Sequence, residues 1–269
     1  MGLFRASLVV ERVRQNRCLK GNELLVPEET VFCRRCFPSL YLDGLANAEK
    51  KQVHSLVASL LEEHEYVREA MNGDEFLVSR LRSLFSLLLG KGGDSLESFV
   101  HAYMFLFWEY LSFPESVGAT PKGRLFWMAK GAPPGTSFRS GSDSANLLIG
   151  RLTQEGVEVD LAAVDIESQT LWLIEIKRAE LDDRAVGQMI RYFDRAVYCL
   201  PFREFRAGNI NFVKPLIILE SVDPKHWITI PLHFRELLDI YTFTSPASQA
   251  GELILTRVRK HLLSVGHRG

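Results

Sequence analysis

The chain has 269 residues, of which 46% are hydrophobic and 24% charged, which allows one large or two small domains with a substantial core. The formal net charge of −1 excludes a protein that attracts nucleic acid with its whole surface, so any such contact must use a local patch. Four cysteines are too few for a secreted disulfide framework, and neither a signal peptide nor an 18-residue apolar run occurs, so we expect a cytoplasmic protein that does not enter membranes.

Residues 1–45 contain one motif that could bind a metal ion. Cys33 and Cys36 form a C-x-x-C pair, which could hold zinc together with Cys18 and His54. The second closely spaced pair that is typical of a zinc ribbon is missing from the sequence. Ordinary thiols are therefore the favoured interpretation, and zinc is the alternative.

Three helices are predicted next, at residues 46–71, 75–89 and 94–110, from apolar residues at helical spacing. The glycine-rich turn between the second and third helices is a plausible domain boundary. We therefore predict a mainly helical N-terminal region at residues 1–93, which could bind DNA or a partner protein, and a second domain at residues 94–269.

Residues 111–144 are rich in Gly, Pro and Ser and predict a long loop that could cover a substrate. Patterns of apolar residues predict further elements on either side of the chain's central region. The expected strands are 124–129, 145–152, 213–220 and 227–232, and the expected amphipathic helices are 234–241 and 249–263.

Two strand patterns in the centre of the chain carry charge where a buried strand should have none. Residues 157–164 alternate, with Asp160 on the polar side, and residues 171–177 are almost continuously apolar but contain Glu175 and Lys177. Because side chains alternate along a strand, Glu175 and Lys177 lie on the same face. Buried charges of this kind cost several kcal/mol unless they are paired, and a divalent cation held by Asp160 and Glu175 would pair with them.

A helix follows, capped by Asp182 or Asp183, with an apolar stripe that starts at Val186. Its polar side chains recur three and four residues apart and therefore share a face. They are Arg184, Gln188, Arg191, Tyr192 and Arg195.

Asp160, the run Glu175-Ile176-Lys177, and a helix with Gln188 and Tyr192 four residues apart resemble the PD-(D/E)XK nuclease superfamily. Within it, the segment is most similar to NucS-type endonucleases, and its Gln-x-x-x-Tyr pair is similar to the signature of RecB-type nucleases. The resemblance implies an α/β fold with a mixed central β-sheet flanked by helices, like that of restriction endonucleases.

The resemblance also implies roles for particular residues. Asp160, Glu175 and the carbonyl of Ile176 would hold one or two Mg²⁺ or Mn²⁺ ions, and Glu97 stands where the family often places a further glutamate. Lys177 would orient or deprotonate the attacking water, and Gln188 would position the substrate. The side chains implied to contact nucleic-acid phosphates are Arg178, Arg184, Arg191, Tyr192 and Arg195.

Other interpretations remain open at this point. Glu158 or Asp165 could replace Asp160 as the metal ligand, and Glu97 could instead stabilise the positive N-terminus of its helix. The leading hypothesis is a Mg²⁺- or Mn²⁺-dependent deoxyribonuclease of DNA repair or anti-phage defence, with a homodimer possible. The alternatives are a catalytically silent nuclease fold that binds DNA or protein, and an interaction protein that recruits a partner through its N-terminal helices.

Overall fold

A computed structural model of the chain forms two compact units. The first comprises Met1–Phe107 with Ser245–Leu253, and the second comprises Trp108–Thr244 with Ile254–Gly269. The division therefore follows Phe107, whereas the sequence predicts a boundary near residue 93. Among the described helices, none combines the length and apolar character needed to cross a bilayer. The structure describes residues 4–26, 29–91, 96–114, 116, 119–129, 144–200, 210–227, 229–244 and 253–258.

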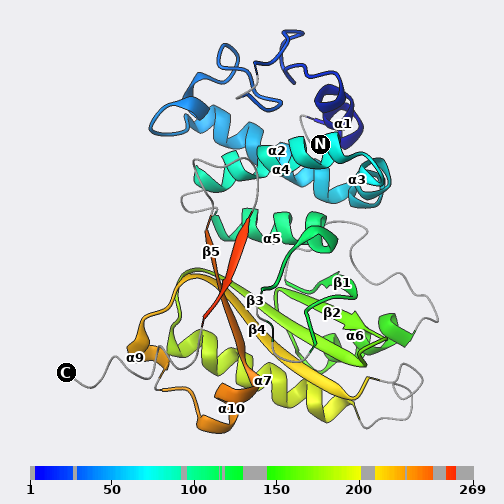
Figure 1. The fold of residues 1–269 in the computed structure, drawn as a ribbon, viewed down its shortest axis with the longest axis vertical. Coiled ribbons are helices and arrows are strands. Elements are labelled where there is room, and N and C mark those ends of the chain that lie inside the picture. Colours follow the sequence, from blue (N-terminus) through cyan, green and yellow to red (C-terminus); the bar gives the residue numbers. More distant parts are fainter. Residues whose placement is uncertain are drawn as a thin grey trace. The chain divides into compact units, whose positions relative to one another are not determined.

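The described part of the first unit is helical, as the sequence predicts (Figure 1). The predicted helix over 46–71 is interrupted at Glu63, whose backbone angles leave the helical region. The asparagine-glycine turn at Gly73, with φ of +74°, then separates two helices as predicted. The elements are α1 (Ala6–Arg14), a short 3₁₀ turn (Pro38–Tyr41), α2 (Asn47–Glu62), α3 (His64–Met71), α4 (Glu75–Gly90) and α5 (Leu96–Phe107).

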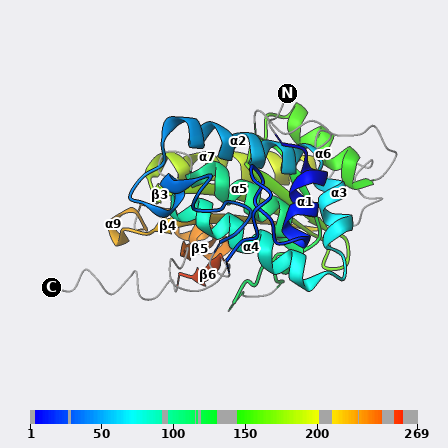
Figure 2. The same cartoon turned by 90° about the horizontal axis from the view of Figure 1, so that it is seen from above.

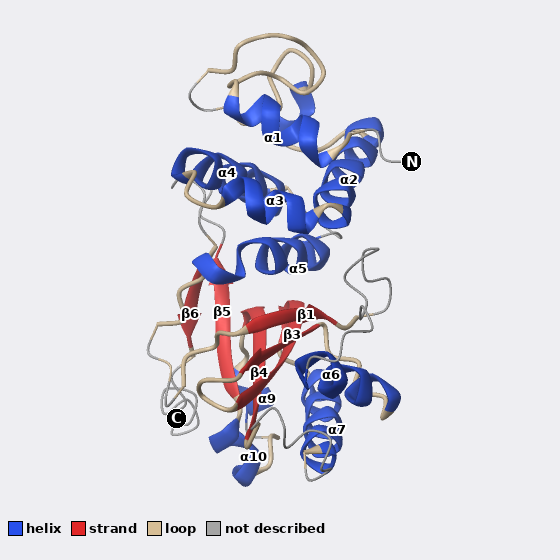
Figure 3. Ribbon diagram, turned by 90° about the vertical axis from the view of Figure 1, so that its right-hand side faces the viewer, coloured by secondary structure: helices blue, strands red, loops and turns tan. Residues whose placement is uncertain are grey.

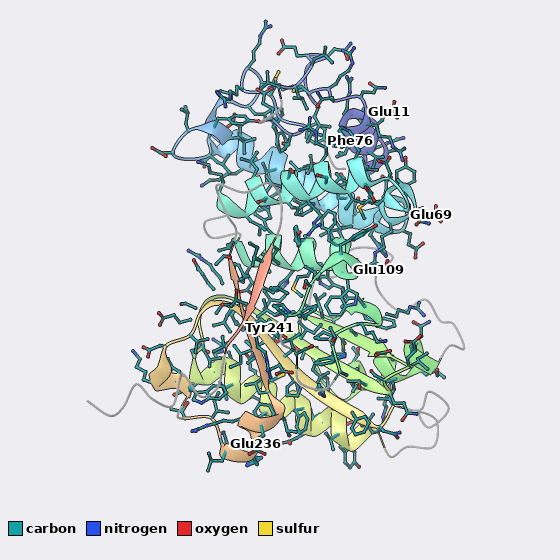
Figure 4. All side chains as sticks on the ribbon, in the orientation of Figure 1. Glu11, Glu69, Phe76, Glu109, Glu236 and Tyr241 are labelled. Atoms are coloured by element: carbon teal, nitrogen blue, oxygen red, sulfur yellow. The ribbon has the colours of Figure 1, made fainter. Side chains whose placement is uncertain are left out.

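The helices of the first unit pack through the leucine-rich stripes that their spacing predicts. In α4 the buried positions include Leu77, Leu81, Leu84 and Leu88, which recur at helical intervals. Polar side chains such as Glu11 and Glu69 lie on the outside of the unit, as does Phe76, which is 53% exposed (Figure 4).

The second unit is built on one six-stranded mixed sheet whose strands follow the order of the chain. The middle strands β3, β4 and β5 are parallel, and the remaining neighbours are antiparallel. Figure 2 shows β5 and β6 side by side at one edge. The strands are β1 (Arg124–Trp127), β2 (Leu161–Asp165), β3 (Thr170–Glu180), β4 (Phe212–Ser221), β5 (Asp239–Thr244) and β6 (Ile254–Arg257).

Helices flank this sheet, which confirms the predicted mixed α/β class with a helical N-terminal region (Figure 3). The helix between the parallel strands β3 and β4 contacts both of them. The helical elements of the second unit are a 3₁₀ turn (Trp108–Tyr110), α6 (Ser144–Gln154), α7 (Asp183–Cys199), α9 (Pro224–Trp227) and α10 (Leu232–Leu237).

One face of the sheet packs against α6 and α7. Leu171 and Leu173 of β3 and Ala162 and Val164 of β2 belong to the same buried cluster as Val186 and other apolar residues of these two helices. Because side chains alternate along strands, the other residues of the same parity in β2 and β3 also point to this helix-covered face. That alternation fixes where the charged residues of β3 lie.

Several predicted elements are wrong. The segment 145–152 is helix α6, because its buried residues Ala145, Leu148, Ile149 and Leu152 recur at helical spacing. Residues 227–232 contain the end of α9 and the start of α10, and the predicted helix 234–241 stops at Leu237 and continues as β5. The described part of the predicted helix 249–263 is strand β6. In 157–164 only the second half is a strand, since β2 begins at Leu161.

The predictions for residues 124–129, 171–177 and 213–220 are confirmed, because β1, β3 and β4 lie there. A large part of the predicted long loop, including residues 130–143, falls outside the described residues.

Asp182 begins the helix that covers the sheet. Its side chain accepts a hydrogen bond from the Ala185 N–H at 2.6 Å, so it is the N-cap of α7. Replacing Asp182 by Ala leaves this N–H without its acceptor, and we expect a loss of about 1 kcal/mol in unfolding free energy. Asp182→Ser keeps a capping oxygen and should lose clearly less, as measured by urea denaturation of both variants.

Candidate functional site

Asp160 and Glu175 lie close together at the end of the β2–β3 pair, since the Asp160 carboxylate accepts from the N–H of Ile176 and both negative charges act on Tyr192. The antiparallel register pairs Ala162 with Leu173 and Leu161 with Ile174, so its continuation by one residue brings Asp160 opposite Glu175. Both share the parity of the residues that pack against α6 and α7. The two residues are only 9% and 4% exposed. Two carboxylates are therefore buried near each other, an arrangement that repulsion between like charges makes unfavourable unless a positive charge compensates it.

The backbone around Asp160 holds its side chain against the edge of β3. Asp160 Oδ2 accepts a hydrogen bond from the Ile176 N–H at 2.7 Å, where the β2 pairing of the described chain has already ended. The Asp160 carbonyl accepts from the N–H of Met128 at 3.0 Å, just after β1. The Asp160 carboxylate is thus held by the edge of β3, and its backbone carbonyl is held by the residue that follows β1.

Lys177 supplies the nearest positive charge in this group. Its Nζ lies 2.7 Å from Glu175 Oε1, and the two side chains are 26% and 5% exposed. The pair has the i,i+2 spacing that the sequence predicts to share one strand face. Lys177 therefore compensates part of the negative charge and reaches toward solvent while Glu175 stays buried.

Helix α7 brings Tyr192 close to the same acidic residues. Burial raises the pKa of Tyr192, and the negative charges of Glu175, Glu158 and Asp160 raise it further, against an opposing effect of Arg191. Gln188 lies one turn earlier on the same helix and is half-buried. The polar stripe of α7 predicted from the sequence thus includes a phenol within electrostatic range of the carboxylates.

The arginines differ in their surroundings. Arg184 and Arg191 are exposed on α7. Arg195 Nη1 donates to the Gly156 carbonyl at 2.7 Å, which ties α7 to the turn after α6 and accounts for this side chain structurally. Arg178 is exposed at the point where the β3–β4 register shifts after Lys177.

The remaining acidic candidates lie elsewhere. Glu97 is in α5 of the first unit, so it does not belong to the structural unit that holds Asp160 and Glu175. Asp165 pairs with Thr170 at the far end of β2, where its carboxylate accepts from the Glu167 N–H and the Ser168 hydroxyl. Glu158 is exposed, although its charge reaches Tyr192. Asp160 is therefore the aspartate that the β2–β3 register brings opposite Glu175.

A buried charge pair in the same unit was not identified from the sequence. Arg257 of β6 lies 2.7 Å from Asp239 of β5, and the two side chains are 14% and 7% exposed. The sequence does contain a sign of this pair, since Asp239 stands directly before the apolar residues 240–241. The predicted helix over 234–241 places this aspartate on a helix, where it does not indicate a buried charge in a strand.

The raised pKa of Tyr192 gives an expected pH dependence. Because its folded-state pKa lies above the unfolded value near 10, its contribution to stability is complete below about pH 10 and is lost as the pH rises through the folded-state pKa. Glu175→Gln removes one of the charges that raise this pKa. We expect the Tyr192 pKa to fall in that variant, as followed by NMR of ¹³C-labelled tyrosine with Tyr192→Phe to assign the signal. An unchanged pKa would contradict the proximity of the two side chains.

Comparisons with known proteins give no relative on which to base a function. No family model, no curated protein and no solved structure matches the chain.

Proposed function

We propose that this protein is a divalent-cation-dependent nuclease that hydrolyses DNA phosphodiester bonds. The observation that carries the proposal is the buried pair of Asp160 and Glu175, which lie close together just before β2 and on β3, with Lys177 beside Glu175. Two like charges at such positions favour a bound cation, and phosphate chemistry is a common use of carboxylate-bound Mg²⁺.

The donor set suits a hard cation. Mg²⁺ is bound in proteins by one or two carboxylates, with water and phosphate oxygens as the other ligands. The backbone of Ile176 adds a donor, because the N–H and C=O of one residue in an extended strand point to the same edge. Its N–H donates to Asp160, so its carbonyl is directed to the Asp160 side of β3. Asp160, Glu175 and the Ile176 carbonyl are therefore the residues that would hold the ion.

When bound, such an ion would lower the pKa of a coordinated water and neutralise the charge on the phosphate in the transition state. Lys177 adds a positive charge next to Glu175, where it would orient the water and stabilise the negative charge that develops on the phosphate. Gln188, Tyr192, Arg184 and Arg191 would hold the phosphate backbone, contacts that position a nucleic acid without reading its sequence.

The proposed fold family is that of restriction endonucleases. It is supported by the succession of an antiparallel pair, β2–β3, a helix, α7, and a parallel neighbour, β4, with the acidic residues at the β2–β3 pair. A mixed sheet of this kind is what the sequence resemblance implies.

The wild-type protein tests the proposal first. Plasmid, linear duplex and single-stranded DNA are incubated with Mg²⁺, Mn²⁺ or excess EDTA, and the products are separated by electrophoresis. We expect cleavage that requires the cation and stops with EDTA. DNA binding without cleavage under every cation would instead indicate a catalytically silent nuclease fold, and the preferred substrate would indicate whether a repair or a defence role is appropriate.

A further inference from the structure

Three of the four cysteines of the chain meet in the first unit. The sulfur atoms of Cys18, Cys33 and Cys36 all lie within 4.8 Å of one another, and the structure forms no disulfide among them. Among the described residues, no other group of three or more potential His, Cys, Asp or Glu ligands lies within this distance. Tetrahedral zinc with sulfur ligands at about 2.3 Å requires sulfurs roughly 3.8 Å apart, so a small contraction of the group suffices.

The backbone around the sulfurs has the character of a metal-binding turn. The N–H of Cys36 donates to Cys33 Sγ at 3.4 Å, and Cys36 and Phe37 both donate to the Cys33 carbonyl. N–H groups directed at sulfur stabilise the thiolate form that binds metals.

Two turns of the same spacing face each other at this group. Cys33-Arg-Arg-Cys36 supplies two sulfurs, whereas Cys18-Leu-Lys-Gly21 supplies one and has glycine in the position of the second. A Cβ added at Gly21 would lie only 3.3 Å from Cys36 Sγ, so this position borders the sulfurs directly. Gly21 therefore stands where a fourth cysteine would complete the set. The fourth ligand must come from another residue or from water.

Glu23 lies beside Cys33, and a shift of its side chain toward Cys18 and Cys36 would let it complete the set, since its carboxylate is not within 4.8 Å of all three sulfurs. Its Oε2 lies 3.6 Å from Cys33 Sγ, and its Oε1 lies 2.6 Å from Arg35 Nη1. His54, the ligand considered from the sequence, instead packs against Phe99 with ring centroids 5.6 Å apart and the rings tilted by 39°. A carboxylate oxygen is an ordinary zinc ligand, and Arg35 offsets the negative charge of the group.

We propose that Cys18, Cys33, Cys36 and Glu23 form a structural zinc site. Zn²⁺ would replace the three thiol protons, which pass to solvent, and would join the segment after α1 to the turn before Pro38–Tyr41. Between α1 and that turn the described chain has no helix or strand beyond the single bridge of Arg17 with Leu24, yet Phe32 and Phe37 are fully buried. A metal clip stabilises such an irregular segment where a regular hydrogen-bonded scaffold is absent.

Zinc is the metal that this donor set favours. Thiolates select zinc, copper(I) or iron–sulfur clusters, and clusters are usually held by four cysteines. The fourth cysteine, Cys199, lies in α7 of the second unit rather than in this group. Three thiolates with one carboxylate around a single site therefore point to a mononuclear zinc ion.

Metal analysis of the purified full-length chain tests the site independently of any nuclease activity. We expect one equivalent of zinc by elemental analysis, which Cys33→Ser and Cys36→Ser lose and the control Cys199→Ala retains. Because a cysteine variant could fail to fold, the wild-type protein is also stripped of metal and titrated with Co²⁺. The expected result is the sulfur-to-cobalt charge-transfer absorption and strong visible bands of a tetrahedral site.

Each of the other outcomes would overturn the assignment. A wild-type protein without zinc that develops no charge-transfer band with Co²⁺ contains no such site. Stoichiometric iron with visible absorption identifies a cluster instead of zinc, and a disulfide found by mass spectrometry in the freshly purified protein identifies a redox pair. For the fourth ligand, Glu23→Gln should keep the charge-transfer band but change the visible bands, and identical spectra would exclude Glu23 from the site.

Discussion

Glu175→Gln is expected to reduce cation-dependent DNA cleavage by roughly a thousandfold or more. The substitution keeps the volume of the side chain but removes the charge that would hold the ion, and an ion of this kind supplies several kcal/mol of transition-state stabilisation, with about 1.4 kcal/mol for each factor of ten. Lys177→Ala should lose about 10²–10³-fold in turnover, as is typical when one charge-stabilising group is removed. Both values come from initial rates of plasmid or oligonucleotide cleavage.

The matched control is Glu180→Gln. Glu180 lies on the same strand and receives the same chemical change, but it is exposed and is not part of the carboxylate pair. The Glu180→Gln variant should cleave DNA at the wild-type rate. Far-ultraviolet circular dichroism and thermal unfolding of each variant separate a loss of chemistry from a loss of fold. Equal cleavage rates for wild type, Glu175→Gln and Lys177→Ala would show that Glu175 and Lys177 take no part in the reaction.

Arg257→Met is expected to lower the unfolding free energy of the second unit by about 3–5 kcal/mol, the usual cost of leaving one partner of a buried ion pair without its counter-charge. Arg257 Nη2 and Asp239 Oδ1 are 2.7 Å apart, and Asp239 is almost completely buried. Methionine fills a similar volume, so the loss reports the charge rather than a cavity. Urea denaturation followed by tryptophan fluorescence measures the change.

The double variant Arg257→Met/Asp239→Leu is the control for this assignment. A buried ion pair replaced as a whole by apolar side chains is often neutral or stabilising, so the double variant should recover most of the lost free energy. If Arg257→Met alone changes the unfolding free energy by less than about 1 kcal/mol, the pair is solvated in solution and the buried-charge interpretation is wrong.

The central elements of the second unit were predictable because their signals are local. Residues 171–174 of β3 are continuously apolar, and Asp182 stands directly before the amphipathic pattern of α7. The errors have equally local causes. The Leu147-Leu148-Ile149 run in α6 has the composition of a short buried strand, and only the wider spacing from Ala145 to Leu152 distinguishes a helix. Around Leu238, helix α10 passes into strand β5 with no glycine or proline between them, so no local breaker marks the end of the helix.

The site was predictable in its residues but not in its geometry. The shared face of Glu175 and Lys177 follows from strand alternation, which is a property of the local chain. That Asp160 stands opposite Glu175 depends on the β2–β3 register, and that Cys18 meets Cys33 and Cys36 depends on how an irregular segment folds back. Such long-range placements are set by packing of the whole unit, so the sequence predicts zinc at Cys18, Cys33 and Cys36 only as the alternative to ordinary thiols.

Binding of Mn²⁺ tests most directly whether Asp160 and Glu175 form a cation site. The free ion is followed by electron paramagnetic resonance during titration of the wild type and of the double variant Asp160→Asn/Glu175→Gln, with Glu180→Gln as the control. We predict that the wild type and the control bind at least one Mn²⁺ that the double variant does not bind. Equal binding by all three proteins would show that the two buried carboxylates hold no cation, and the proposed nuclease mechanism would lose its basis.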